Sequence, residues 1–310
     1  MWDVLRGVGA ILYSKATLYT HKGVADAKTG GAMTGWPKRC AEWIDGHNAY
    51  LSVPFTWLLP GVYQRAVWLA TEGYIVRAGG PAVSLMPDYL AGVAQIGGEV
   101  DALPHHNPNA TFTSRGCIRH CQFCAVWRVE GGLRELDEWE PRPIVCDNNL
   151  LACSVKHFDR VIDRLKPLTG IDFNQGLDAR LLTNHHASRL AELDCTVRLA
   201  WDHIDTGNQF MQAYERLRKA GIAKRRIQVY VLIGYKDKPD EAWFRLRTVW
   251  NLGIKPNPMR YNPLDAMVRD AYIGEHWTGR LLRAYMRYWS CLVHVAGVPF
   301  EEWLEREGEQ

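Results

Sequence analysis

Three cysteines, Cys117, Cys121 and Cys124, lie within eight residues of the sequence in a C-x3-C-x2-C arrangement. Thiolate sulfurs this close along the chain can bind one metal centre together. A structural zinc site normally has four ligands in two separated pairs, and the sequence contains no second C-x2-C pair. His120 lies inside the first spacing, where its geometry as a fourth ligand is poor. The pattern therefore favours an iron–sulfur cluster bound by three cysteines.

A four-iron cluster with three protein ligands has one iron with an open coordination position. In metal sites an open position marks a reactive centre, whereas a complete set of protein ligands marks a structural one. The spacing thus predicts a cluster that does chemistry. The alternative is a non-catalytic metal-binding module, with zinc or a redox thiol group in the same place.

The cysteine motif follows a predicted strand at residues 110–116, and Phe123 directly precedes its third cysteine. In these features the chain resembles the radical S-adenosylmethionine (SAM) superfamily over about residues 108–265. The resemblance implies a [4Fe-4S] cluster whose open iron binds SAM. It also implies reductive cleavage of SAM to a 5′-deoxyadenosyl radical, which takes a hydrogen atom from a substrate. The electron would come from a flavodoxin-like or ferredoxin-like protein.

The same resemblance implies cofactor contacts near the ends of several predicted strands. The pair after the second strand would hold the SAM amino group, the fourth strand would contact its ribose and carboxylate, and the fifth would contact adenine. The glycine pair common after the second strand, and the first glycine of the fifth-strand motif, are both absent. A helix-capping turn and structural salt bridges are the alternatives. The implied contacts are Phe123, Asp147, Asn148, Arg198, Asp202, Ile233 and Gly234.

Further polar residues end the third and sixth predicted strands. Side chains at the carboxyl ends of parallel strands meet in one place, where barrel enzymes have their active sites. We therefore expect these residues to contact the substrate or take part in catalysis. Helix caps and surface ion pairs are the alternative. The residues are Asn174, Gln175, Asp178, Arg180 and Tyr261.

Strand-like and helix-like stretches alternate about six times after residue 108, which predicts parallel strands connected by helices. We expect an α/β fold with a partial (β/α)6 TIM-like barrel over residues 108–265. A small α/β domain over residues 1–107 would precede it, and C-terminal helices over residues 266–310 would follow. A Pro-, Asn- and His-rich segment, residues 100–110, marks the first boundary.

Individual elements follow from hydrophobic periodicity. In the small domain we expect strands over residues 49–60 and 74–86, and helices over residues 61–73 and 87–97. Later helices are expected over residues 154–168, 207–220, 240–252 and 278–307. The last of these is expected to cover the barrel, although its arginines could also form a basic face.

The small domain has features of cobalamin-binding domains in incomplete form. Ala78-Gly79-Gly80-Pro81 resembles their Gly-Gly-Pro turn, but Asp45-Gly46-His47 lacks the glycine of the D-x-H-x-x-G pattern. Cys40 alone is too few for the second cluster of methylthiotransferases. We therefore expect a degenerate domain without cobalamin, and a cobalamin-dependent radical SAM methyltransferase is the alternative.

Composition limits the partners only broadly. The 310 residues carry a formal net charge of +3, which weakly favours a nucleic-acid base or nucleotide as substrate. A small metabolite or peptide is the other substrate class. No apolar run reaches the roughly 18 residues of a membrane helix. Residues 1–19 lack a basic leader, and the eight cysteines are not spaced like a disulfide framework. We therefore expect a cytoplasmic protein with no membrane partner.

Overall fold

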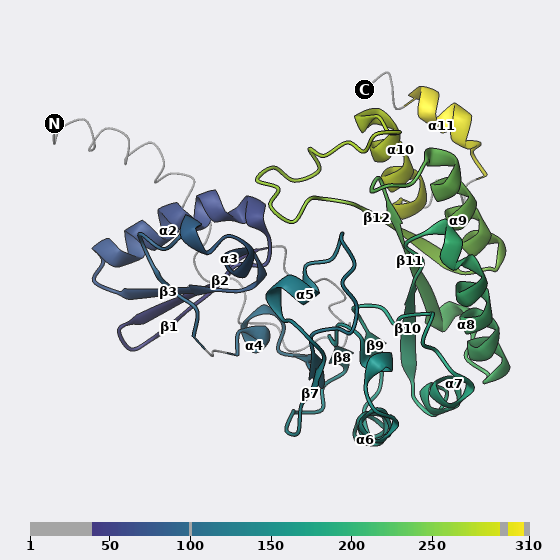
Figure 1. The fold of residues 1–310 in the computed structure, drawn as a ribbon, viewed down its shortest axis with the longest axis horizontal. Helices are drawn as coiled ribbons and strands as arrows, with labels where there is room; N and C mark the ends of the chain where they lie inside the picture. The colour runs from purple at the N-terminus through teal and green to yellow at the C-terminus, as the bar shows by residue number, and fades with distance from the viewer. Residues whose placement is uncertain (1–38, 99–100, 292–296, 307–310) are drawn as a thin grey trace. The chain divides into compact units, whose positions relative to one another are not determined.

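The computed structural model describes residues 39–98, 101–291 and 297–306 (Figure 1). The chain divides into two compact units, residues 1–36 and 37–310, and the first lies outside the described residues. The prediction that residues 1–19 are not a secretory leader therefore concerns residues that are not described. The second unit contains two separate hydrophobic cores, one under each of its two larger sheets.

A six-stranded sheet carries the larger core, and all of its strand pairs are parallel. The strands lie side by side in chain order, so every crossover steps to the next strand in the same direction. β5 and β12 are its two edges, so these described strands form an open sheet and not a closed barrel. The expected α/β class with parallel strands is confirmed. The strands are β5 (Ala110–Thr111), β8 (Ile144–Val145), β9 (Ile171–Phe173), β10 (Cys195–Ala200), β11 (Ile227–Ile233) and β12 (Lys255–Arg260).

Helices cover one face of this sheet, as Figure 1 shows. Right-handed crossovers that always step in one direction place their helices on the same side. On β11, Ile227, Val229, Val231 and Ile233 are buried, while the residues between them are only half-buried on the opposite face. The four helices that follow successive strands are α6 (Val155–Leu165), α7 (Asn184–Leu190), α8 (Gly207–Lys219) and α9 (Pro239–Asn251).

Local capping explains where these helices begin. Ser154 accepts a hydrogen bond from the His157 amide and caps α6, and Pro239 occupies the first turn of α9. The helices predicted over residues 154–168, 207–220 and 240–252 are confirmed to within three residues at each end. The single helix expected over residues 278–307 is wrong in one respect, because α10 (Gly279–Ser290) and α11 (Phe300–Arg306) are separate. α10 packs against β12.

The smaller core lies under a four-stranded sheet in the order β1-β2-β3-β4. β1 and β2 form an antiparallel hairpin that the sequence analysis did not anticipate, with Asp45-Gly46-His47 at its turn. Gly46 has a φ of 55°, which suits glycine. β2, β3 and β4 are parallel. The elements are β1 (Ala41–Asp45), β2 (Asn48–Ser52), α2 (Leu59–Thr71), β3 (Ile75–Gly79), α3 (Pro81–Leu85) and β4 (Gln95–Ile96).

Three expectations for this region are wrong in extent. The strand and turn expected over residues 74–86 are a strand that ends at Gly79 and the helix α3 after it. The strand expected over residues 49–60 ends at Ser52, because Pro54 cannot donate a ladder hydrogen bond and a helix begins soon after. The helix expected over residues 87–97 is only a 3-10 turn followed by β4. The remaining short elements are η2 (Thr56–Leu58), η3 (Pro87–Tyr89), α4 (Leu103–His106), η4 (Leu150–Ala152), η5 (Ile204–Thr206) and η6 (Lys224–Arg226).

Candidate metal and cofactor site

The three cysteines lie on one loop whose two ends are held together. β6 (Ser114–Arg115) pairs with β7 (Arg134–Glu135) in antiparallel fashion, and the loop connects them. Gly116 enters the loop with a φ of +75°, and a Cβ there would lie 2.2 Å from the Gly132 carbonyl oxygen. Only glycine fits this position. The backbone at Gly116, one residue before the first cysteine, therefore lies in close contact with the backbone at Gly132.

Glu130 fixes the base of the cysteine loop. Its carboxylate accepts two hydrogen bonds from Arg115 and one from the Gly116 amide, each at 2.9 Å. It also accepts one from Asn148 Nδ2 at 2.7 Å. Asn148 follows β8, so this contact ties the loop to the carboxyl end of that strand. The sequence analysis expected Asn148 to contact the cofactor and missed Glu130, which no motif or periodicity identifies.

Asp147 has a supporting position next to the loop. Its buried carboxylate accepts hydrogen bonds from the Thr113 amide at 2.6 Å, from the Thr113 hydroxyl and from Ser114 Oγ at 2.8 Å. Burial raises the pKa of Asp147, although these hydrogen bonds favour the charged form. Both carboxylate oxygens are thus engaged by the segment that leads into the cysteine loop. In this arrangement Asp147 positions the loop, while the sequence analysis expected it to hold the SAM amino group.

All three loop cysteines are free and half-buried. The Cys117 sulfur accepts hydrogen bonds from the Arg119 amide and from Asn149 Nδ2, both at 3.4 Å. Burial raises the pKa of Cys121 and Cys124, and repulsion among the three thiol groups contributes in the same direction. Hydrogen bonds to sulfur are a standard means of tuning an iron–sulfur cluster.

The other two sulfurs have neighbours that favour their charged form. Arg180 acts to lower the pKa of Cys121 and the Val126 amide acts to lower that of Cys124, although burial outweighs both effects. Val126 begins the short helix α5 (Val126–Val129), which follows the third cysteine directly. Each of the three sulfurs thus has a protein group nearby that stabilises its thiolate form. Free thiols with such neighbours fit the requirements of cluster-bound thiolates.

Within the described ranges, no three His, Cys, Asp or Glu side chains converge on a point where they could hold one metal ion. Such convergence is a property of a site for one ion. The cysteines of a four-iron cluster bind different irons, so their sulfurs do not share one ion.

Asp178 and Arg180 join the end of β9 to the cysteine loop. Asp178 Oδ2 accepts a hydrogen bond from Arg119 Nε at 2.6 Å, and Oδ1 accepts one from Arg180 Nε at 2.6 Å. Burial alone would raise the pKa of Asp178, but the two arginines outweigh it and hold the pKa below its usual value. Both residues were expected at the site, and the structure brings both to it.

Asp202 follows β10 and also faces this charged group. Burial raises its pKa to about 6, while the positive charges of Arg180 and Arg245 act in the opposite direction. A carboxyl group with this pKa is half-protonated near pH 6, where it can accept or donate a hydrogen bond. Its expected place near the cofactor is therefore consistent with its surroundings.

Arg198 is held within the sheet. It makes two hydrogen bonds of 2.6 Å to Asp172 on β9 and others to Gln228 Oε1 at 2.8 Å and the Tyr230 hydroxyl at 3.1 Å. Tyr230 in turn donates to the Asn174 carbonyl at 3.1 Å. This network lies on the half-buried face of the sheet. Arg198 has the bidentate partner of a structural salt bridge, which was the alternative to a SAM contact.

Aromatic rings connect the cysteine loop to the ends of β11 and β12. Phe123 contacts Tyr235 edge-on at 5.5 Å between ring centres, Tyr235 contacts Tyr261 at 4.7 Å, and Tyr261 contacts Tyr272 at 5.2 Å. Gln122 of the loop also accepts a hydrogen bond from the Tyr235 hydroxyl at 3.2 Å. The expected residues Phe123 and Tyr261 are thus joined through Tyr235, which the sequence analysis did not select.

Ile233 and Gly234 end β11 in a packed environment. The Ile233 side chain is fully buried in the core, so it lies away from any ligand. Gly234 has a φ of +79°, and a Cβ there would lie 2.8 Å from Leu282 of α10. The conformation and this close packing are sufficient to require glycine, whether or not adenine also lies nearby.

A buried ion pair supports the ends of two strands, and the sequence analysis missed it. Arg245 of α9 contacts Asp237 at 2.5 Å and donates to the Trp201 carbonyl at 2.9 Å. Asp237 also accepts from the Gly234 amide at 2.9 Å. The pair therefore fixes the backbone beside Asp202 and at the end of β11. A helix arginine eight residues after an aspartate gives no signal of this in the sequence.

Asn174 and Gln175 follow β9. Asn174 is half-buried and Gln175 is exposed, and neither side chain makes a hydrogen bond to any described residue. Both amides are therefore available to a ligand at the carboxyl end of the sheet.

No protein-family model matches the sequence, and a search of curated proteins finds no similar one. Over the ranges that the structure covers, no helix combines the length and apolar character that crossing a membrane requires. The chemistry of the site is therefore argued from its geometry. Three thiols, two arginines and several carboxylates meet where parallel strands end, which is the position expected for an active site.

Proposed function

We propose that the protein is a radical SAM enzyme in which Cys117, Cys121 and Cys124 bind a [4Fe-4S] cluster. One observation carries the proposal. The cysteine loop contacts residues that follow the parallel strands: Asn149, after β8, donates to the Cys117 sulfur, and Asp178, after β9, accepts a hydrogen bond from Arg119 of the loop. A structural metal module has no need of this placement, whereas an active site of an α/β enzyme requires it.

When bound, such a cluster would supply an electron to SAM and so generate the radical that removes hydrogen from the substrate. The protein's own residues have simpler tasks. Asn149 and Arg180 would stabilise thiolates, and the Phe123 and Tyr235 rings would keep water away from the loop. Asp202 would accept hydrogen bonds from hydroxyl groups of the ligand. The electron would come from a flavodoxin-like or ferredoxin-like partner.

We infer that the open six-stranded sheet is a partial barrel whose interior is its half-buried face. The Arg198–Asp172 pair would then form the lower boundary of the substrate space. Asn174, Gln175 and Tyr261 would lie at its upper end, close to the cysteine loop. The substrate itself is not specified by these residues. We propose no cobalamin for the smaller sheet, because its Asp45-Gly46-His47 segment is a hairpin turn.

The proposal is tested by anaerobic purification and reconstitution of the whole chain. We expect about four irons and four sulfides per chain, with cluster absorption bands that bleach on reduction. Addition of SAM and a strong reductant should release 5′-deoxyadenosine. Cys121→Ala should lose the cluster and this activity. Cys195→Ala is the matched control, because Cys195 is equally free but lies buried elsewhere.

Two results would contradict the proposal. One is zinc as the bound metal with no release of 5′-deoxyadenosine from the wild type. The other is normal iron content in Cys121→Ala, which would show that the loop cysteines are not the ligands. Iron loss in Cys146→Ala would identify a wrong choice of ligand set.

A further inference from the structure

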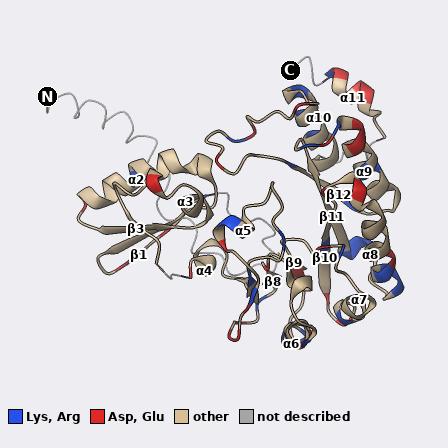
Figure 2. Ribbon diagram, in the orientation of Figure 1, with Lys and Arg blue, Asp and Glu red and all other residues tan. Residues whose placement is uncertain are grey.

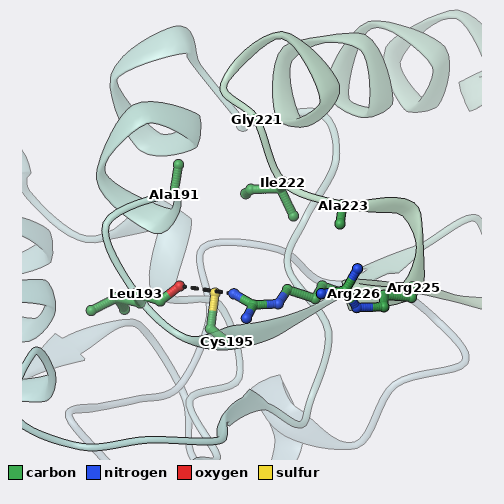
Figure 3. Close-up of a pocket in the computed structure, with 8 residues that line it drawn as sticks. All are labelled: Ala191, Leu193, Cys195, Gly221, Ile222, Ala223, Arg225 and Arg226. Carbon is green, nitrogen blue, oxygen red and sulfur yellow. Dashed lines mark hydrogen bonds between the residues drawn. The ribbon is translucent and has the colours of Figure 1, made fainter.

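A cavity opens at the end of the six-stranded sheet opposite the cysteine loop, between the amino ends of β10 and β11 (Figure 3). Its volume is about 220 Å³. Apolar side chains and polar groups both line it, and two arginines lie at one side. The lining residues are Ala191, Leu193, Cys195, Gly221, Ile222, Ala223, Arg225 and Arg226.

Backbone geometry and one fixed arginine keep the cavity open. Gly221 ends the turn after α8 with a φ of +93°, and a Cβ there would meet nothing within 4 Å. Arg226 is held by an ion pair with Asp194 at 2.5 Å and by a hydrogen bond to the Leu193 carbonyl at 3.5 Å, drawn as a dashed line in Figure 3. Arg225 is exposed and points along the same side. Arg226 is thus a fixed part of the cavity wall, while the exposed Arg225 side chain is free to contact a ligand.

Four exposed cations lie around this end of the sheet, and we call them the basic edge: Lys219, Lys224, Arg225 and Lys255. Within the part of the chain that the structure describes, none of the four has a carboxylate partner. Lys224 lies against Gly253, two residues before Lys255, so the edge continues from η6 to the start of β12. Figure 2 shows the blue positions near the end of α8.

A favourable position in the fold accounts for only one of these four cations. Lys219 lies in the last turn of α8, where a cation interacts favourably with the helix dipole. Lys224 and Arg225 lie in a three-residue 3-10 turn, and Lys255 begins a strand. No helix dipole accounts for these three. Unpaired like charges this close repel one another, and several phosphate groups would relieve that repulsion.

We propose that the pocket and the basic edge bind the backbone of a single-stranded nucleic acid. Phosphates would lie along the basic edge, and one sugar or base would enter the pocket between its apolar side chains and the two arginines. The cations come from a helix, a turn and a strand, so they would contact more than one phosphate. A single strand is favoured because its nucleotides are free to turn into a pocket, whereas those of a duplex are stacked. The proposal does not depend on the cluster.

The test is fluorescence anisotropy of labelled 20-nucleotide single strands, DNA and RNA, with the full chain in phosphate-free buffer. We expect affinity that falls with salt. The double variant Lys224→Gln/Arg225→Gln should bind about tenfold more weakly at low salt. Its log–log salt slope should fall by about 1.4, that is about 0.7 for each lost phosphate contact. Lys156→Gln is the matched control, because it removes an exposed charge from α6.

A second variant tests the pocket separately from the charge. Ala223→Leu should fill part of the cavity and weaken binding several-fold without changing the salt slope. The proposal is overturned if the wild type binds no single strand, or if Lys156→Gln loses as much affinity as the double variant. Tighter binding of a duplex of the same length would also overturn it. Full displacement of the strand by millimolar inorganic phosphate would show a simple anion site instead.

Discussion

The two ends of the six-stranded sheet differ in how many of their arginines and lysines have carboxylate partners, although Arg226 at the amino end is also paired, with Asp194. At the carboxyl end, Arg180 faces Asp178 and Arg245 faces Asp237, both within 2.6 Å. At the amino end, Lys224 and Arg225 are exposed and face no carboxylate of the described chain. Paired charges fix the positions of the groups around them, whereas unpaired ones remain free to meet a ligand. The comparison indicates a preorganised site at one end and an electrostatic binding surface at the other.

Cysteines show the same contrast between the two ends. Cys195 begins β10 at the amino end, where burial raises its pKa to about 12 and its thiol donates to the Leu190 carbonyl at 3.4 Å. Cys117 at the other end is half-exposed and accepts two hydrogen bonds. A buried thiol of this kind is an inert packing group. A sulfur that accepts hydrogen bonds from amide donors is stabilised in its negatively charged thiolate form.

The largest effect is expected from breaking the buried pair beneath the carboxyl end. Arg245→Met keeps an unbranched side chain but removes the guanidinium group, so the Asp237 carboxylate is left buried without its cation. Loss of one partner of a buried pair costs about 3–5 kcal/mol, and we expect that loss in the free energy of unfolding by urea at pH 8. Arg225→Met is the matched control at the exposed end and should change stability by less than about 0.5 kcal/mol. Equal effects at the two positions would remove the contrast between the ends.

A smaller and more local effect is expected at the base of the cysteine loop. Glu130→Gln places an amide donor against the Arg115 and Gly116 donors that now meet a carboxylate. Charged hydrogen bonds of this kind contribute about 2 kcal/mol, so backbone amides of residues 116–133 should exchange hydrogen about 30-fold faster. Glu138→Gln, in an exposed position, should leave exchange unchanged. Unaltered exchange in Glu130→Gln would show that Glu130 does not hold the loop.

The pH dependence of stability gives a third comparison. Asp202 has a folded pKa of about 6, above the roughly 4 of an unfolded carboxyl. The stability that Asp202 contributes to the folded state is therefore fully present below about pH 4 and is lost as pH rises through 6. Relative to the wild type, Asp202→Asn should gain about 2 kcal/mol of stability between pH 4 and pH 7. The exposed Asp205→Asn should show no such gain, and a flat difference for Asp202→Asn would contradict the raised pKa.

The fold was largely predictable from the sequence, because its signals are local. Apolar periodicity identified the helices that cover the sheet, and the alternation of strands and helices indicated parallel pairing. The β1–β2 hairpin was missed because residues 41–45 carry a weak strand pattern before a short turn. The helix expected over residues 87–97 failed because its apolar residues pack below the smaller sheet without continuous helical hydrogen bonding.

The residues of the site could be predicted only where their spacing in the sequence is itself typical of a chemical role. The spacing of Cys117, Cys121 and Cys124 is short enough to be recognised, and strand ends indicated Asp178 and Arg180. Partners distant in the chain gave no signal. Glu130 and the Asp237–Arg245 pair act through contacts that only the folded chain creates. For Arg198 the sequence left a ligand contact and a structural salt bridge open, and the fold pairs it with Asp172, a partner that the sequence did not indicate.

The smallest effect is expected where charge has no partner in the chain. Lys224→Gln/Arg225→Gln removes two cations whose neighbours, Lys219 and Lys255, are also positive. Loss of that repulsion should leave the free energy of unfolding unchanged or raise it by up to about 0.5 kcal/mol, more at low salt than at high salt. Urea unfolding at two salt concentrations measures this. A clear loss of stability would mean that these cations hold the fold together, and the distinction between a structural end and a binding end of the sheet would fail.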